Sequence, residues 1–313
     1  MATRLSNDYY TIAIANASYG VQVTDLTGAV AMSDVVLEIK SDKQLADTKI
    51  KTQTLAPDVL EKIVTSQAAT VTMKGNLCTG YEWLLQAATH TASSPYTFAD
   101  AQAGNDYSYC LYKYYPGTTG SYDVALGCVM SDFRITGESN GILQFESTFR
   151  AKSLRRGVAS TGGDEVTNIP ANTPSTPFLF GDVTATLNNA ASTMLSFSLS
   201  LSKTFEDDKV IYQNSLTELN ELITGYSGTL EYVTIYDDEQ DPAVEQNIGS
   251  QAATAFDIIN LISGDITWTF TCNSMVTDFS LPDKDKGLFE ATTSLSLAMA
   301  DTTEPIEISV VEA

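Results

Sequence analysis

Strict alternation of apolar and polar residues is the feature that most constrains how this chain can fold. In MLSFSLSLS, residues 194–202, leucine and phenylalanine take one set of alternate positions and serine takes the other. Successive side chains of a β-strand point to opposite faces, so a period of two predicts a strand with one buried face. ITWTFTC at residues 266–272 and SLSLAMA at residues 294–300 show the same period. We therefore expect a mainly β protein with short helices, of the sandwich or barrel type.

Four short segments carry helical signals. PDVLEKIVTS at residues 57–66 has a proline in the first helical position and acidic residues in its first turn. SLTELNELITG at residues 215–225 offers a serine N-cap, a capping-box glutamate and a final glycine. Residues 80–88 and 254–264 have apolar residues at helical spacing. We predict one short helix in each segment.

An internal repeat relates the two halves of the chain. Residues 122–151 align without a gap on residues 268–297, which sets Asp132 on Asp278 and Phe133 on Phe279. The predicted elements before this block also follow the same order in both halves. Recurrence of a whole series of elements indicates a tandem duplication.

A segment with little to bury separates the two copies. Residues 155–177 read RRGVASTGGDEVTNIPANTPSTP and contain three glycines and three prolines. This composition predicts an extended, mobile connector rather than a packed element. We divide the chain into a first copy at residues 1–156, a linker at 157–177 and a second copy at 178–313. The length and the 43% hydrophobic content allow a core in each copy.

The charge is strongly negative and unevenly spread. The net charge is −22; residues 1–156 hold 13 basic and 15 acidic residues, whereas residues 157–313 hold 4 and 24. So acidic a surface cannot gain the counterion-release energy that drives binding to nucleic acid. It can lie beside nucleic acid and repel it.

The cysteines and the histidine argue against metal and disulfide chemistry. No two of the four cysteines form a C-x-x-C pair, which predicts buried, reduced thiols at Cys78, Cys110, Cys128 and Cys272. His90 is the single histidine, so most imidazole metal sites are excluded, and we expect His90 to have a structural or solvent-exposed role. No segment approaches the roughly 20 apolar residues of a membrane span, and the first residues lack the apolar part of a signal peptide. We expect a soluble protein that is not conventionally secreted.

The sequence GESNG around Ser139 matches the G-x-S-x-G pattern of a hydrolase nucleophile elbow. An elbow requires a helix after the serine and a histidine later in the chain, but the next segment is strand-like and no histidine follows. Asn140 and Gly141 instead favour a type I′ hairpin turn, whose two central residues both need φ > 0. We interpret this segment as a hairpin turn, with Lys286 and Gly287 in the matching turn of the second copy.

Three further patterns have ordinary structural explanations. The acidic stretches at residues 281–290 and 236–246 lack the ligand pattern of a calcium loop and fit solvated loops. The aromatic stretch YSYCLYKYYPG at residues 107–117 has only Lys113 as a cation, which favours a core or interface strand over stacking on bases or sugars. Neither a phosphate-binding loop nor a dinucleotide fingerprint occurs. We predict no catalytic, cofactor or metal site.

The polar faces of the predicted strands consist of serine and threonine. Charged residues make up 18% of the chain, below the roughly 25% of typical soluble domains. Exposed strands are usually protected by charge, so these hydroxyl-rich strands indicate sheets that partner subunits cover. This composition points to assembly.

The repeated β-rich unit, the long strand leading into a charged loop, the closing hairpin and the acidic balance resemble the major tail tube proteins of long-tailed bacteriophages. The resemblance implies a structural virion protein, not an enzyme, that stacks rings into a hollow tube. A duplicated chain implies trimeric rings with pseudo-sixfold symmetry around a β-barrel, with an acidic lumen that lets DNA slide during ejection.

The same resemblance implies partners, location and contact residues. Partners would be further copies of the chain and other tail proteins, such as tape measure, terminator and distal tail proteins. Genomic DNA would pass without specific binding, no membrane is involved, and the virion tail would be assembled in the host cytoplasm. The N-terminal stretch to residue 19 and the tail at residues 302–313 would be terminal arms that bridge successive rings. Two charged loops would make inter-ring contacts, through Ser41, Asp42, Lys43, Asp47, Lys49, Lys203, Glu206, Asp207, Asp208 and Lys209.

Two alternatives remain from the residues alone. A two-domain β-sandwich adhesin or carbohydrate-binding module would use Tyr112 and Tyr114 in its binding strip. A hydrolase would use Ser139 and His90, against the chain order that the elbow requires.

Overall fold

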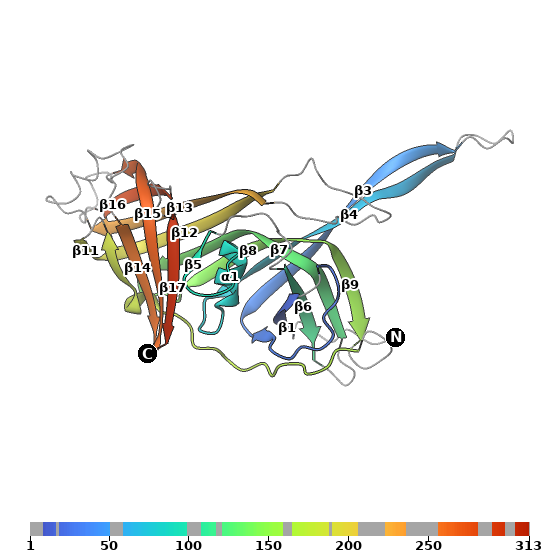
Figure 1. Cartoon of the computed structure of the whole chain (residues 1–313), viewed down its shortest axis with the longest axis horizontal. Coiled ribbons are helices and arrows are strands. Elements are labelled where there is room, and N and C mark those ends of the chain that lie inside the picture. Colours follow the sequence, from blue (N-terminus) through green and yellow to red (C-terminus); the bar gives the residue numbers. More distant parts are fainter. Residues whose placement is uncertain are drawn as a thin grey trace.

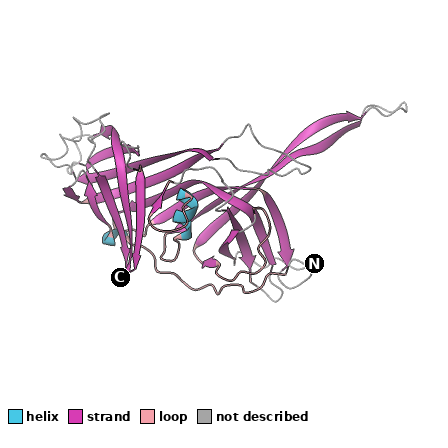
Figure 2. Cartoon of the chain, viewed as in Figure 1, coloured by secondary structure: helices cyan, strands magenta, loops and turns pink. Residues whose placement is uncertain are grey.

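The computed structural model describes residues 9–16, 19–50, 59–98, 108–116, 121–158, 165–187, 190–205, 223–235, 256–280, 290–297 and 304–312. In this part of the chain the fold is mainly β and antiparallel, which confirms the expected fold class. One α-helix, α1 (Trp83–Thr89), and one 3-10 turn, η1 (Phe180–Asp182), are the helical elements among these residues (Figure 2).

The strands divide between the two halves of the chain. The first half forms β1 (Tyr10–Asn16), β2 (Val30–Met32), β3 (Val35–Ile50), β4 (Val59–Asn76), β5 (Tyr96–Thr97), β6 (Ser108–Tyr115), β7 (Ser121–Glu138), β8 (Gln144–Ala151) and β9 (Ser153–Val158). The second half forms β10 (Thr184–Leu187), β11 (Ala190–Ser192), β12 (Met194–Phe205), β13 (Ile223–Ile235), β14 (Phe256–Ser263), β15 (Ile266–Ser280), β16 (Glu290–Leu297) and β17 (Ile306–Glu312).

Eight of these strands form what we call the central sheet, in the order β3-β4-β8-β7-β12-β13-β16-β15. The first four strands come from the first half and the last four from the second half. The pairing of β7 with β12 joins the two groups. The central sheet therefore runs across both halves without a break.

Two side sheets lie on the same side of the central sheet as α1, beneath it in Figure 1. The first has the order β2-β1-β6-β7-β9, and the second has the order β11-β10-β14-β15-β17-β5. The strands β7 and β15 each belong to two sheets: the N-terminal part of each lies in a side sheet and the C-terminal part in the central sheet. The order of pairing in the first half thus recurs in the second, apart from the additional β5.

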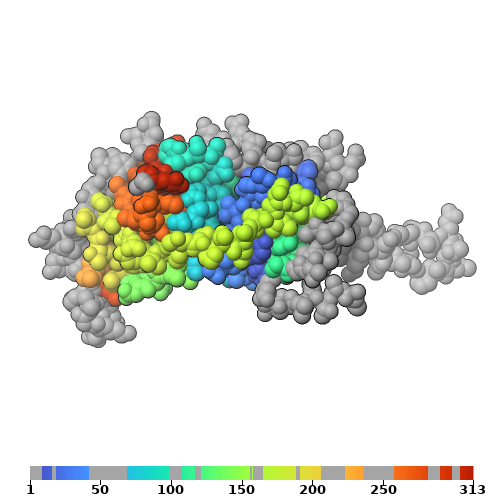
Figure 3. Space-filling view, turned by 90° about the horizontal axis from the view of Figure 1, so that it is seen from below, coloured from blue at the N-terminus to red at the C-terminus, as the bar shows by residue number. Residues whose placement is uncertain are grey.

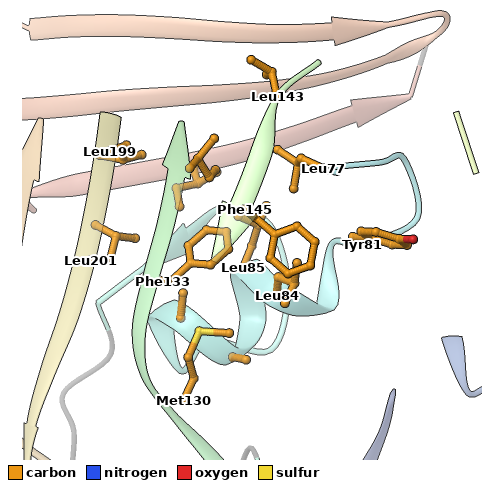
Figure 4. Packing of buried hydrophobic residues seen from close by; sticks show 14 of the residues in the cluster. Leu77, Tyr81, Leu84, Leu85, Met130, Phe133, Leu143, Phe145, Leu199 and Leu201 are labelled. Atoms are coloured by element: carbon orange, nitrogen blue, oxygen red, sulfur yellow. The ribbon is translucent and has the colours of Figure 1, made fainter. Parts of the chain in front are cut away.

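The larger of two buried clusters lies between the central sheet and the elements beneath it. Phe133 and Phe145 point from β7 and β8 toward Leu84 and Leu85 of α1 (Figure 4). Side chains of β12, among them Leu199 and Leu201, belong to the same buried cluster, which therefore draws on both halves. Full burial of one such side chain contributes about 2 kcal/mol to stability. The half-buried strand that the alternation at residues 194–202 predicted is confirmed as β12.

The helix predicted at residues 80–88 is confirmed as α1, although it begins at Trp83. The helix predicted at residues 57–66 is wrong where the structure describes it, because residues from Val59 onward belong to β4. The helix predicted at residues 254–264 is also wrong, because Phe256–Ser263 forms β14 with Ile259 and Leu261 buried on one face. Of the helix predicted at residues 215–225, residues 215–222 lie outside the described part, and Ile223 begins β13.

The segment between the halves is extended, as predicted, but its described part is packed. Residues 165–177 run along the molecule from one half to the other, coloured yellow-green in Figure 3. Val166 is buried, and backbone bonds join Thr167 to Thr24 and to Leu26 (2.8 and 3.0 Å). Phe178, which follows, packs against Trp268. Backbone hydrogen bonds hold this segment against its neighbours, although its composition offers few side chains to bury.

The four cysteines are buried and free, as predicted. Burial raises the pKa of the Cys78 and Cys110 thiols to about 11, so these thiols stay protonated and unreactive at neutral pH. None of the helices in the described residues has the length and apolar character needed to cross a membrane.

Candidate assembly surface

One face of the central sheet has no described element packed on it, and we call it the open face. Side chains on alternate positions of its eight strands point to this face, while their neighbours point into the core. Serine and threonine predominate there on the second-half strands. They include Ser196, Ser198, Ser200, Ser202, Thr229, Thr292, Ser294 and Ser296.

Charge on the open face differs between the two halves. The first-half strands carry both signs there, at Glu38, Lys40, Lys74, Asp132, Arg134, Glu138, Glu146 and Arg150. At the described positions of the second-half strands the charged residues are acidic: Glu231, Asp278 and Glu290. The open face is therefore balanced over the first four strands and mildly acidic over the last four.

Polar contacts on the open face tie β7 to β12. Ser202 donates its hydroxyl to Asp132 (Oγ to Oδ1, 2.9 Å), and Arg134 donates to Ser198 (Nε to Oγ, 2.9 Å). Underneath, Phe133 and Leu201 are opposite each other in the register and are both buried. This junction combines buried apolar side chains on one face with side-chain hydrogen bonds on the other, the usual composition of a stable strand pair.

A β-bulge recurs at the same place in both halves. Ser131 is the extra residue between Met130 and Asp132 of β7, and Thr277 is the extra residue between Val276 and Asp278 of β15. Their hydroxyls donate to equivalent carbonyl oxygens, Ser131 to Thr148 (3.1 Å) and Thr277 to Ser294 (2.9 Å). Bulges re-aim the residues that follow and are kept as designed features.

The central sheet ends in two strand edges that the described residues leave unpaired. Within this part of the chain β3 pairs only with β4, and the C-terminal part of β15 pairs only with β16. An unpaired edge presents a row of N–H and C=O groups that can pair with another chain.

The hairpin of β3 and β4 extends away from the body of the molecule (Figure 1). From Ala69 to Asn76, β4 also pairs with β8, but residues 59–68 of β4 pair only with β3 among the described strands. We call this outer part, residues 41–50 with 59–68, the arm. A lone two-stranded hairpin is marginally stable in water, so the arm requires further support.

The first set of predicted contact residues lies on the arm, but in a strand rather than in a loop. Ser41, Asp42, Lys43, Asp47 and Lys49 belong to β3 and pair with residues of β4. The predicted charged loop at this position is therefore wrong. The continuous ladder with the β-branched residues of β4 explains the strand.

The second set is largely outside the described residues, and its first member is not a surface contact. Lys203 is buried on β12, where its Nζ donates to the Ala87 carbonyl oxygen at the end of α1 and lies 3.5 Å from His90 Nδ1. Burial lowers the pKa of Lys203 to about 7. Glu206, Asp207, Asp208 and Lys209 lie outside the described residues.

The hairpin predicted at residues 136–143 is confirmed, with a correction to its turn. Residues 139–143 connect β7 to β8, and the Gly141 N–H donates to the Glu138 carbonyl oxygen (3.0 Å). Asn140 has φ of 65°, whereas Gly141 is not in the left-handed region, so the turn is not type I′. The matching Lys286 and Gly287 lie outside the described residues.

The features behind the two alternatives take structural roles. Ser139 is followed by the strand β8, not by the helix that an elbow requires. His90 is buried and caps α1 with φ of 66°, which confirms a structural role. Tyr112 is fully buried, and its hydroxyl donates to the Val23 carbonyl oxygen, so it cannot form part of an exposed binding strip.

Sequence reasoning missed the residues that build the β7–β12 junction. The first pair, Asp132 and Arg134, lies more than sixty positions before Ser198 and Ser202 in the sequence. Alternation of apolar and polar residues predicts strands but does not specify which strands pair. The one available signal was the repeat, which aligns Ser131 on Thr277 immediately before the shared Asp-Phe pair.

Comparisons with known proteins bear on most of the chain. A family model described as phage tail tube protein matches residues 13–260. Among solved structures, a chain from the virion of a native gene transfer agent particle is similar, at 12% identity and a TM-score of 0.30; the match covers 42% of this chain and 97% of that one. No curated protein matches this sequence.

Proposed function

Since the chain belongs to the phage tail tube protein family and is a structural tail protein, we propose that its copies assemble into stacked rings that form a hollow tube. The observation that carries this proposal is the central sheet, which runs across both halves and ends in two edges that the described strands leave unpaired. Copies placed side by side would extend the sheet, and closure into a ring would leave no edge exposed.

The repeated topology supports a tandem duplication and a ring of three chains. Both halves have the same strand order in the central sheet, the same crossing of β7 and β15 into a side sheet, and the same bulge at Ser131 and Thr277. We keep the division into a first copy at residues 1–156, a linker at 157–177 and a second copy at 178–313. Three chains of two copies each would give the ring pseudo-sixfold symmetry.

The open face is our candidate for the wall of the lumen. The opposite face is covered by α1 and the side sheets, so closure with that face inward would leave no channel. On the open face, serine and threonine hydroxyls alternate with balanced charges and with the acidic residues of the second half. At its described positions this surface has no basic patch for phosphates, so DNA would pass without specific binding.

The arm is our candidate for contact between successive rings, through the predicted residues Ser41, Asp42, Lys43, Asp47 and Lys49. The support is its need for a partner, because residues 59–68 of β4 pair with β3 alone among the described strands. An adjacent ring would cover both faces of this hairpin. The part of the second set outside the described residues, Glu206 to Lys209, stays a proposal of the same kind.

Assembly into a tail implies partners besides the chain itself. We propose contacts with tape measure, terminator and distal tail proteins at the ends of the tube and in its lumen, and assembly in the host cytoplasm.

Electron microscopy of the purified chain tests the proposal. Negative-stain images over a range of protein concentrations should show rings or tubes with a central hole. Sedimentation of the same samples should give a species of three chains or multiples of three. A dispersed monomer at high concentration in both measurements would refute assembly by the chain alone.

A further inference from the structure

We propose that, in the ring of the proposed function, the free edge of β15 pairs with the free edge of β3 in the next chain, in the register that joins β7 to β12 within one chain. The inference rests on ring assembly but specifies which residues meet. The intrachain junction serves as the template.

The junction of β7 with β12 can serve as a template because β3 and β12, and likewise β7 and β15, occupy equivalent positions in the two halves. In the first half Leu37 pairs with Met73, Met73 with Ser147, and Ser147 with Phe133. In the second half the same series runs from Phe197 to Tyr232, Thr293 and Phe279. Therefore β3 is equivalent to β12, and β15 is equivalent to β7. Because β7 pairs with β12, the equivalent partner of β15 is a β3 strand. Within one chain β3 lies at the opposite end of the central sheet, so the partner must come from another chain.

The register follows residue by residue. Within the chain Asp132 is opposite Ser202, Phe133 is opposite Leu201, and Arg134 is opposite Ser200. The equivalent positions set three pairs between chains, which are Asp278 with Asp42, Phe279 with Ser41 and Ser280 with Lys40. The shared bulge makes the transfer reliable, because Ser131 and Thr277 orient the strand in the same way immediately before these residues.

Burial distinguishes the completed junction from the two free edges. Phe133 is 1% exposed at the β7–β12 junction, whereas the equivalent Phe279 on β15 is only partly buried. Likewise Leu199 on β12 is 2% exposed, and the equivalent Ile39 on β3 is partly buried. Both edges thus carry an apolar residue that pairing would bury.

The same register places one pair of opposite charges side by side on the open face. In the intrachain junction Arg134 bonds diagonally to Ser198 rather than to the residue directly opposite. The same diagonal across the proposed junction brings Lys40 beside Asp278, and Glu38 beside Ser280. The register also sets Asp42 opposite Asp278, a repulsion that Lys40 offsets because it lies diagonal to Asp278 on the same face. All of Glu38, Lys40, Asp278 and Ser280 are exposed in the single chain.

Cross-linking between differently tagged chains tests the register. One chain carries Ser280→Cys and the other Lys40→Cys, and they are mixed before assembly with a bifunctional thiol reagent of about 5 Å span, the separation of opposite Cβ atoms. The four native cysteines are buried and give a low background. We expect a cross-linked pair of unlike tags in the ring fraction.

The matched control replaces Lys40→Cys by Val36→Cys, which lies on the same exposed face of β3 four residues away, about 13 Å along the strand. We expect no cross-link from Val36→Cys. Cross-linking to Val36→Cys instead, in samples whose micrographs contain rings, would overturn the register while ring assembly stands.

Hydrogen exchange of the unmodified chain covers the case in which a cysteine variant fails to assemble. On ring formation, those amides of residues 39–42 and 278–280 that point to the free edges should exchange at least about tenfold more slowly, because exchange then requires opening of strand hydrogen bonds. Unchanged exchange at these residues in verified rings would also overturn the proposal. An absence of rings in every sample would instead count against the proposed function.

Discussion

Replacing Lys203 by methionine should raise the stability of the chain at neutral pH, and the gain should shrink as the pH rises. The Lys203 side chain is buried between β12 and the end of α1, and burial lowers its pKa from 10.5 to about 7. Between these values the folded state holds a neutral amine, whereas the unfolded state holds a charged one. The unfolded state therefore binds more protons, and stability increases with pH in this window.

The size of the effect follows from the two pKa values. Their separation corresponds to about 5 kcal/mol in total, of which about 2 kcal/mol is recovered between pH 7 and pH 9. The difference in unfolding free energy between Lys203→Met and the native chain should thus fall by about 2 kcal/mol over that range. The lost hydrogen bond to Ala87 adds an offset that is the same at each pH.

Urea unfolding, followed by the fluorescence of the buried Trp268, measures this difference. Lys74→Met is the matched control for the loss of a lysine side chain, because Lys74 is exposed on the open face. If the Lys203→Met difference is constant with pH, the Lys203 amino group is solvated in the folded chain and the reasoning is refuted.

Three further substitutions test the packing by the same unfolding assay. Gly137→Ala should cost about 1–3 kcal/mol, because a Cβ there would lie 2.5 Å from Leu143 and 2.8 Å from Phe197, whereas Gly181→Ala, with no atom within 4 Å of its Cβ, should change little. Equal effects would contradict the close packing of the junction. Thr277→Val should cost about 1 kcal/mol by removing the hydroxyl bond across the bulge, and Thr277→Ser, which retains the hydroxyl, should not; equal costs would exclude a role for that bond. Asn140→Val should cost about 1–2 kcal/mol because of its positive φ, while Ser139→Ala should be neutral; a destabilising Ser139→Ala would contradict the plain-turn interpretation.

Much of the architecture could be predicted because alternation and repetition are properties of the sequence itself. The period of two at residues 194–202 reports a strand with one buried face, and β12 has that form. The alignment of Asp132-Phe133 with Asp278-Phe279 anticipated equivalent positions in β7 and β15. These signals are local or internal to the chain and do not depend on knowing which strands pair.

The helix errors arose where both faces of a strand carry apolar residues. In β14, Ile258 and Ile262 lie on one face and Ile259 and Leu261 on the other, and together they imitate helical spacing. In β4, the proline and the acidic residues at positions 57–61, which are typical of a helix start, were outweighed by sixteen residues of β3 that pair along the strand. Short local propensity is a weak preference that a long hydrogen-bonded ladder overrides.

The candidate assembly surface was predictable only in kind. Hydroxyl-rich strands and low charge indicated covered sheets, but the β7–β12 junction depends on pairing between residues more than sixty positions apart. Lys203 shows the same limit, because a charged residue in a loop-like sequence is buried by an element from the other half of the chain.

The most direct test of ring assembly is an electron cryo-microscopy reconstruction of the particle that the full chain forms. We predict three chains per ring, with the central sheet continuous from each β15 to the next β3 and the open face turned toward the lumen. A ring whose chains meet through the side sheets, or whose open face points outward, would contradict it.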